Sequence, residues 1–302
     1  SHFRMLRPLL GLDKQEIIDE ARVLGAHTYS QVGAAYTVGM TGAPGSGKSS
    51  LAAELASVVR SEQQRLAILA VDPSSPFTGG AILGDRVRMQ DHVTDDGIYI
   101  RSMATRGHLG GLSLATPQAI RVLDALNWPW ILVETVGVGQ VEVEIAGAAD
   151  TTIVVVNPGW GDAVQANKAG LMEVADIFVV NKSDRKGADD TRRDIQQMLE
   201  LSSLGDWEPP IVMTVATDQL GADELWQTVG EHRSYLEESG ELEARRKLRV
   251  QAELTEIVNR SLEQRVITAM EGPETADLKE KLARGEIDPY AAAARLIDLS
   301  DG

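Results

Sequence analysis

The sequence predicts an α/β fold in which a mostly parallel central sheet has helices on both faces. Apolar runs alternate with helical patterns along most of the 302 residues, and several runs are apolar at nearly every position. The clearest runs are Ile131–Val133, Ile153–Val156 and Ile177–Val180. A strand that is apolar at every position is buried on both faces, as strands of parallel sheets are. Ligands of such folds bind beyond the carboxyl ends of the strands, so polar residues at those ends are candidates for a site.

The elements of this fold follow one another in a regular order. An amphipathic helix is expected over residues 13–26, within an N-terminal segment of residues 1–34, because apolar residues recur there at helical spacing. The domain of residues 35–238 comes next. Its strands are expected at residues 36–41, 66–71, 97–102, 130–134, 151–156, 176–181 and 210–214. Its helices are expected near residues 48–64, 115–126, 140–148, 163–174, 188–203 and 219–237.

The character of the sequence changes after residue 238. A long charged helical pattern begins at Glu241 and runs to about Met270, where Gly272 and Pro273 end it. Its apolar stripe consists of Leu248, Leu254, Ile257, Val258, Leu262 and Ile267. Two short helical patterns follow near residues 274–284 and 288–298. This C-terminal extension, residues 239–302, is expected either to pack on its own domain or to serve as an arm for self-association.

Composition excludes several classes of function. The net charge of −16 argues against general binding of nucleic acid or anionic lipid, because both need a basic surface. The absence of cysteine excludes disulfides and thiolate metal ligands, and it fits a reducing cytoplasm. The N-terminus has no signal-peptide pattern, and no apolar run approaches membrane-spanning length. A cytoplasmic protein that binds neither membrane nor nucleic acid is therefore expected.

Residues 42–49 carry the most informative pattern of the chain, G-x-x-x-x-G-K-[ST], between a predicted strand and a predicted helix. Backbone N–H groups of such a loop and of the helix start surround phosphate oxygens. Lys48 supplies a positive charge for the terminal phosphates, and the Ser49 hydroxyl is placed to bind Mg²⁺. The residues expected to bind the nucleotide are Gly42, Ala43, Pro44, Gly45, Ser46, Gly47, Lys48, Ser49 and Ser50.

A second motif indicates which base is bound. Asn181-Lys182-Ser183-Asp184 follows a predicted strand and matches N-K-x-D, the guanine-reading motif of G proteins. The Asp184 carboxylate can accept two hydrogens from the N1 and 2-amino positions of guanine, which adenine does not offer in that pattern. GTP is therefore expected in preference to ATP. Backbone N–H groups of Thr214, Val215 and Ala216, after the next strand, are candidates to complete the base pocket.

Acidic residues at other strand ends are candidates for catalysis and for the magnesium ion. Glu134 and Gly137 stand where many GTPases have D-x-x-G, in which the acid serves Mg²⁺ and the glycine N–H contacts the γ-phosphate. Asp72 and Asp85 flank a glycine-rich loop and can reach the ion or an attacking water. The expected metal residues are Ser49, Asp72, Asp85 and Glu134, and the expected catalytic residues are Lys48, Asp72, Asp85, Glu134 and Gly137. Val138 follows the glycine, so no glutamine there orients the water, and unaided hydrolysis is expected to be slow or to use another residue.

Together these motifs resemble one family, the MeaB/ArgK-type G proteins that serve adenosylcobalamin-dependent acyl-CoA mutases. The resemblance covers roughly residues 35–236 and rests on residues 42–49, Asp72–Pro76 with Gly79–Arg86, Glu134–Gln140 and Asn181–Asp184. It implies a homodimeric GTPase chaperone that gates cofactor loading of a mutase and protects the mutase from inactivation. The segment Asn157–Gly170 is similar to the family's third switch, which makes Asp162, Gln165 and Lys168 candidates for coupling hydrolysis to the mutase.

Three other functions are compatible with a phosphate loop. A GTPase that delivers nickel needs Cys or His ligands, but the chain has no Cys and its five histidines form no close cluster in the sequence. A small-molecule kinase would use the same loop, although the N-K-x-D motif argues against it. A module that binds nucleotide without turning it over is the third alternative.

Overall fold

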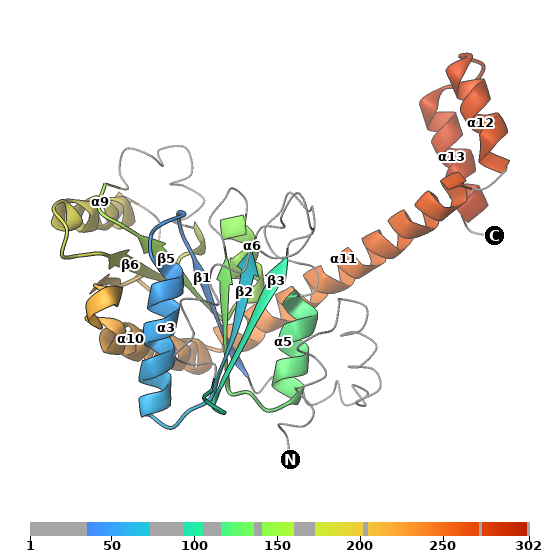
Figure 1. The fold of residues 1–302 in the computed structure, drawn as a ribbon. Coiled ribbons are helices and arrows are strands. Elements are labelled where there is room, and N and C mark those ends of the chain that lie inside the picture. The colour runs from blue at the N-terminus through green and yellow to red at the C-terminus, as the bar shows by residue number, and fades with distance from the viewer. Residues whose placement is uncertain are drawn as a thin grey trace. The chain divides into compact units, whose positions relative to one another are not determined.

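The computed structural model describes residues 35–72, 94–104, 116–135, 141–159, 173–201, 205–271 and 274–300. The chain divides into two compact units, Ser1–Leu242 and Glu243–Gly302. Figure 1 shows a sheet flanked by helices in the first unit and a helical second unit. The predicted helix over residues 13–26 and most of the one over residues 163–174 lie outside the described residues.

The first unit contains a seven-stranded sheet in the order β3-β2-β4-β1-β5-β6-β7. Every neighbouring pair is parallel, so the predicted fold class is confirmed. The strands are β1 (Tyr36–Thr41), β2 (Leu66–Asp72), β3 (Ile98–Ala104), β4 (Trp130–Thr135), β5 (Thr151–Val156), β6 (Ile177–Asn181) and β7 (Ile211–Thr214). Strand β1 lies in the middle, and its carboxyl end leads directly into the predicted phosphate loop.

Helices cover both faces of this sheet, as the doubly apolar strands predicted. Along β5, Ile153 and Val155 belong to one buried cluster, whereas Val154 and Val156 belong to another. The first face packs against α3 (Lys48–Ser61) and α10 (Ala222–Ser239). The second packs against α5 (Thr116–Ala125), α6 (Val141–Ala148) and α9 (Ala188–Leu201), and a short 3₁₀ helix, η3 (Ala216–Asp218), follows β7. The polar residues at the strand ends are thereby held on a rigid core.

The second unit is helical. It contains most of α11 (Glu241–Glu271), then α12 (Glu274–Ala283) and α13 (Pro289–Ser300), so the three predicted C-terminal helices are confirmed. Asp288 caps α13 because its Oδ1 accepts the N–H groups of Tyr290 and Ala291 at 2.9 and 3.0 Å. Leu278 and Ala292 are buried between α12 and α13. Among the described residues, no helix is long and apolar enough to span a membrane.

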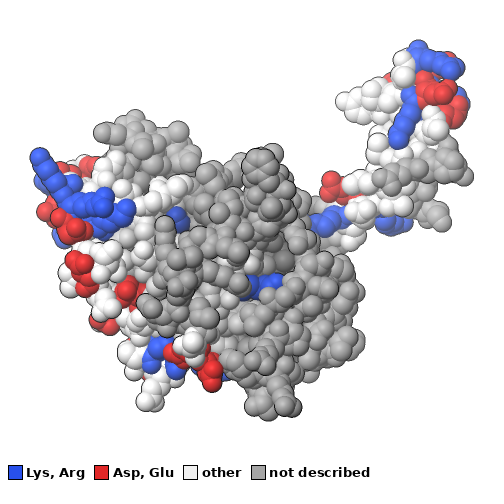
Figure 2. All heavy atoms as spheres, in the orientation of Figure 1, with Lys and Arg blue, Asp and Glu red and all other residues white. Residues whose placement is uncertain are grey.

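Charges of both signs are mixed over the described surface. Figure 2 shows acidic and basic side chains side by side over α9 and over the second unit. On α9, Arg193 pairs with Asp190 three residues before it. On α12, Lys281 pairs with Asp277 at 2.6 Å. This face of the described surface therefore offers mixed charge to a partner.

Candidate functional site

The loop between β1 and α3 takes its shape from two glycines. Gly42 has a φ of +135°, and a Cβ there would lie 2.0 Å from the backbone oxygen of Val155 on β5. Gly47 has a φ of +95°, and a Cβ there would lie 2.3 Å from Asn181 Nδ2. Both positions therefore require glycine, for conformation and for space. The fixed glycines of the predicted motif are the residues that let this loop pass close to neighbouring strands.

Lys48, the first residue of α3, directs its ammonium group back into the loop. Its Nζ donates to the backbone oxygens of Gly42 at 2.7 Å and Ala43 at 3.1 Å. The side chain is buried, although the tip of the loop at Pro44 and Gly45 is exposed. The start of α3 adds N–H groups and the positive end of the helix dipole. A positive charge and helix N–H groups thus converge where an anion is expected.

Two hydroxyl-bearing residues of this loop and helix differ in their partners. The Ser49 hydroxyl donates to Glu134 Oε1 at 2.7 Å, and both side chains are buried. Glu134 lies near the end of β4, the strand next to β1. The buried Ser46 hydroxyl, by contrast, has no hydrogen-bond partner among the described residues. Ser50 is half-buried on the same turn of α3 as Ser49.

The Ser49–Glu134 pair fits a magnesium ion. Mg²⁺ prefers oxygen ligands, keeps several waters, and is usually held by one or two protein groups together with substrate phosphates. A hydroxyl and a carboxylate that are already 2.7 Å apart at the start of α3 match this requirement. No group of three or more His, Asp or Glu side chains suited to a metal occurs in the part of the chain that the structure describes. The site is therefore suited to an ion that arrives with phosphates.

The predicted guanine motif lies against the phosphate loop. Asn181, the last residue of β6, donates from Nδ2 to the Ser46 backbone oxygen at 2.8 Å. Lys182 has a left-handed φ of +60°, and its Nζ donates to the Gly45 backbone oxygen at 2.6 Å. These two contacts span more than 130 residues of sequence, with separations of 135 and 137. The structure thus brings the phosphate motif and the base motif together at the carboxyl ends of the strands.

Strand β7 fixes the orientation of the Asn181 amide. Asn181 Oδ1 accepts the Thr214 hydroxyl at 3.1 Å and the Ala216 N–H at 3.2 Å. The Ser183 N–H donates to the Thr214 backbone oxygen at 3.0 Å, which holds the turn that follows β6. Val215 is buried between Thr214 and Ala216, and Asp184 is exposed on the turn. The sequence drew attention to the backbone of residues 214–216, but it missed the Thr214 side chain.

Several predicted site residues lie where the structure gives no description of their side chains. Asp72 is the last residue of β2, and only its backbone position is described. The residues outside the described part are Asp85, Gly137, Asp162, Gln165 and Lys168. Their roles stay predictions from the sequence.

A parallel sheet whose central strand leads into a phosphate loop, with an Asn-Lys-x-Asp motif held against that loop, defines the class of P-loop GTPases. A family model described as methylmalonyl-CoA mutase-associated GTPase MeaB matches residues 12–271. The chain belongs to this MeaB family.

Two relatives agree with this assignment, and one solved structure agrees with the fold. A protein of Pyrococcus abyssi is 49% identical over 284 residues, which cover 92% of this chain and 87% of that relative. The GTPase ArgK of Escherichia coli is 38% identical over 213 residues, which cover 68% of this chain and 64% of ArgK. A solved structure named LAO/AO transport system kinase has a TM-score of 0.65 at 22% identity, covers 100% of this chain and 98% of its own, and supports the fold alone.

Proposed function

We propose that this member of the MeaB family binds GTP with Mg²⁺ and hydrolyses it to GDP and phosphate. The observation that carries the proposal is the contact of Asn181 and Lys182 with the backbone oxygens of Ser46 and Gly45. This contact puts a base-reading motif beside a phosphate loop. Ser49, at the start of α3, bonds Glu134 of β4 next to that loop.

In this proposal, each residue acts by position and charge. Lys48 and the loop N–H groups hold the β- and γ-phosphates, while Ser49 and Glu134, with Asp72 and Asp85, hold Mg²⁺. The bound ion would supply charge neutralisation at the phosphate oxygens. The Gly137 N–H contacts the γ-phosphate, and Asp72 orients the attacking water. Phosphoryl transfer needs little more than this, because its catalysis is mainly positioning and electrostatic stabilisation.

The family description supports a mutase as the partner of this GTPase. The client would be an adenosylcobalamin-dependent acyl-CoA mutase, and the GTPase would act in the cytoplasm as its chaperone by gating cofactor loading. We assign to Asp162, Gln165 and Lys168 the role of coupling GTP hydrolysis to mutase binding. Val138 stands where other GTPases have a water-orienting glutamine, so turnover would be slow until the mutase binds.

A homodimer that pairs through α11 completes the proposal. An apolar side chain stands at every fourth position along this helix. The row consists of Val250, Leu254, Val258, Leu262, Val266 and Met270. All of them except the half-buried Val266 are 39 to 61% exposed. Such a row forms a ridge, and ridges of this kind interlock when two helices cross at about −50°. A second copy of the same helix offers the matching row.

The dimer is tested by sedimentation of the full-length chain. Leu254→Lys together with Leu262→Lys places two charges on the ridge and should produce a monomer. Leu220→Lys is the matched control, because Leu220 is an exposed leucine (59%) that belongs to the first unit and not to α11. A wild-type chain that is monomeric, or a double variant that still dimerises, refutes this arm of the proposal.

Base recognition is tested by Asp184→Asn. An amide donates where the carboxylate accepted, so it should favour xanthine, which has an oxygen in place of the 2-amino group of guanine. Calorimetric titration with GDP and xanthosine diphosphate should show the preference reversed. Asp190→Asn, an exposed acid on α9, is the control and should keep the preference for GDP. Equal affinity of the wild type for GTP and ATP would reject guanine recognition.

Hydrolysis is tested by phosphate release without any added acceptor, which also excludes a kinase. Lys48→Ala should lose this release, because the charge that holds the terminal phosphates is gone. If the wild type and Lys48→Ala release phosphate equally, even with a mutase present, the chain is not a hydrolase.

A further inference from the structure

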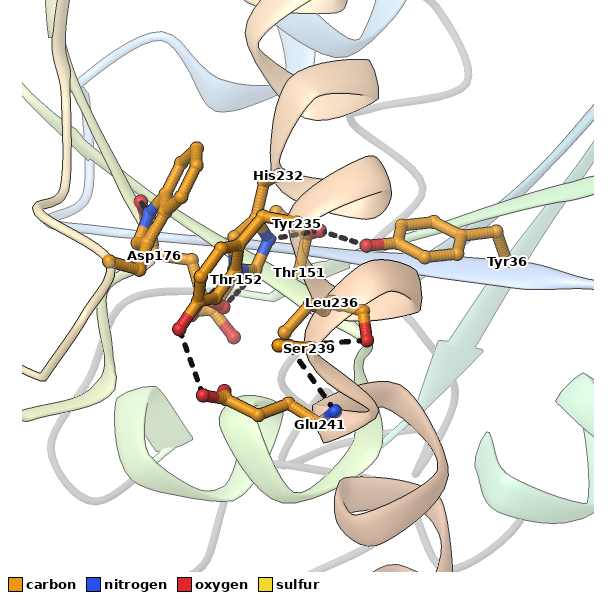
Figure 3. A network of polar contacts seen from close by, with 10 residues as sticks. Tyr36, Thr151, Thr152, Asp176, His232, Tyr235, Leu236, Ser239 and Glu241 are labelled. Carbon is orange, nitrogen blue, oxygen red and sulfur yellow. Dashed lines mark hydrogen bonds and ion pairs between the residues drawn. The ribbon is translucent and has the colours of Figure 1, made fainter.

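A polar network lies at the amino ends of the strands, whereas the candidate nucleotide site lies at their carboxyl ends. Figure 3 shows its side chains converging on His232 of α10. Three of them stand at the amino ends of adjacent strands: Tyr36 begins β1, Thr151 begins β5, and Asp176 immediately precedes β6. The carboxyl ends of β1 and β6 carry the phosphate loop and the guanine motif. The same two strands therefore join the network to the candidate site.

The hydrogen bonds of the network give His232 a defined place. The imidazole is fully buried, with Nδ1 2.8 Å from Thr151 Oγ1 and Nε2 3.3 Å from Asp176 Oδ1. Thr151 Oγ1 is also 2.7 Å from the Tyr36 hydroxyl. Burial raises the pKa of Tyr36 well above its ordinary value, so this hydroxyl keeps its proton. His232 Nδ1 therefore shares a hydrogen bond with Thr151 Oγ1, and Nε2 faces the Asp176 carboxylate.

Asp176 and its neighbours hold the strand ends together. Asp176 Oδ2 accepts the Thr152 N–H at 2.7 Å, and its own N–H donates to the Thr152 backbone oxygen at 2.9 Å. The Trp207 indole donates to the Asp176 backbone oxygen at 2.8 Å, and its ring lies 4.7 Å from the His232 ring. A shift of β6 relative to β5 would therefore disturb several contacts at once, and the loss of a buried hydrogen bond is costly.

The network continues to the first residue of α11. The Trp207 ring lies 5.2 Å from the ring of Tyr235, and the Tyr235 hydroxyl donates to Glu241 Oε1 at 2.9 Å. The Glu241 N–H donates to Ser239 Oγ at 3.3 Å. Leu242 packs against the main core cluster. The beginning of α11, within the first unit, is thus attached through Tyr235 to the strand ends (Figure 3).

We propose that this network couples nucleotide binding to the start of α11. A guanine nucleotide that contacts both the phosphate loop and the guanine motif sets the separation of β1 and β6 at their carboxyl ends. The strands are five or six residues long, so they carry that change about 15–20 Å to their amino ends. There the His232 network transmits it to Glu241. The inference rests on the proposed guanine-nucleotide site, and it adds a route by which that site is sensed at the beginning of α11.

Hydrogen exchange of the full-length chain tests the coupling. GDP with Mg²⁺ should slow backbone exchange in the first turn of α11 at least about fivefold, the lower end of typical allosteric couplings, besides protecting the phosphate loop. Tyr235→Phe removes only the hydroxyl that reaches Glu241, and Thr151→Val breaks the link between Tyr36 and His232. Both should abolish the effect on α11 while protection of the phosphate loop by GDP persists. Tyr290→Phe is the matched control, because Tyr290 is 89% exposed in the second unit, and it should behave like the wild type.

The outcomes separate this inference from the proposed function. If GDP protects the phosphate loop but leaves the first turn of α11 unchanged in the wild type, the coupling is wrong and the nucleotide site stands. The same holds if Tyr235→Phe, which is expected to fold normally, retains the full effect. If calorimetry and exchange both show no binding of GDP, the proposed function fails and the coupling fails with it.

Discussion

Gly47→Ala should damage the site far more than Gly45→Ala, although the two glycines belong to the same loop. Both have left-handed backbones, with φ of +95° and +78°. A Cβ on Gly45 meets nothing within 4 Å, whereas a Cβ on Gly47 would lie 2.3 Å from Asn181 Nδ2. The buried Asn181 amide would have to move, and its bond to the Ser46 backbone oxygen would break. The pair of variants therefore isolates the contact between the two motifs from the general effect of adding a methyl group.

The expected difference follows from the structure. Each alanine carries about 1–2 kcal/mol of left-handed strain, so this contribution is shared. Gly47→Ala adds the cost of leaving a buried amide or carbonyl unpaired, which is about 1–3 kcal/mol. The free energy of unfolding should therefore fall by about 1–2 kcal/mol for Gly45→Ala and by about 2–5 kcal/mol for Gly47→Ala.

Urea unfolding of the nucleotide-free proteins measures this difference, since a bound ligand would add its own stabilisation. Equal losses in the two variants would mean that Asn181 does not lie against the phosphate loop, and the reasoning for a joined site would be refuted. A larger loss for Gly45→Ala would have the same consequence.

Three further perturbations test other parts of the molecule. Glu134→Gln keeps an oxygen for the Ser49 hydroxyl but removes the negative charge. The increase in GDP affinity that Mg²⁺ gives, measured by calorimetry, should therefore fall about tenfold to a hundredfold. An unchanged Mg²⁺ dependence would show that Glu134 does not belong to the metal site. Thr214→Val should weaken GDP binding about two- to tenfold, because the Asn181 amide loses the hydrogen bond from the Thr214 hydroxyl. Thr228→Val is the control, because the Thr228 hydroxyl bonds the Glu224 backbone oxygen within α10, and this variant should bind GDP normally. Equal GDP affinities in the two variants would show that the Thr214 hydroxyl does not support the base motif. Because the pKa of Tyr36 is raised in the folded protein, above pH 10 the unfolded chain releases a proton that the folded protein keeps. The free energy of unfolding should therefore fall by up to about 1.4 kcal/mol per pH unit in that range. Denaturation at pH 9 to 11 should show a shallower fall of this free energy for Tyr36→Phe.

The strands could be predicted almost to the residue because they are apolar on both faces. The expected range 151–156 is β5, Thr151–Val156. Helix ends were harder. The first domain helix was expected to reach residue 64 but ends at Ser61, because Gln63 takes a left-handed φ of 60°. Such a stop is usually marked by glycine, and glutamine gives no such signal.

The motifs of the candidate site were visible in the sequence, but the contacts that join them were not. Asn181 and Thr214 meet because β6 and β7 pair in a register that sets them opposite each other. The sequence predicts both strands and contains nothing that fixes this register. His232 was equally hidden. A lone histidine is usually a surface or packing residue, and its partner Thr151 is 81 residues away.

The contacts around Asn181 and Ser49 suggest how affinity is divided over the proposed site. The Asn181 amide is held by Thr214, Ala216 and Ser46, so contacts within the protein set its orientation. Ser49 is similarly placed, because its hydroxyl donates to Glu134 Oε1, and its oxygen is the atom that would bind the metal. In the proposed site, side chains that contacts within the protein already hold need little ordering by a ligand, so more of the binding energy of the phosphates is left for changes elsewhere in the protein, which is what a nucleotide-dependent switch requires.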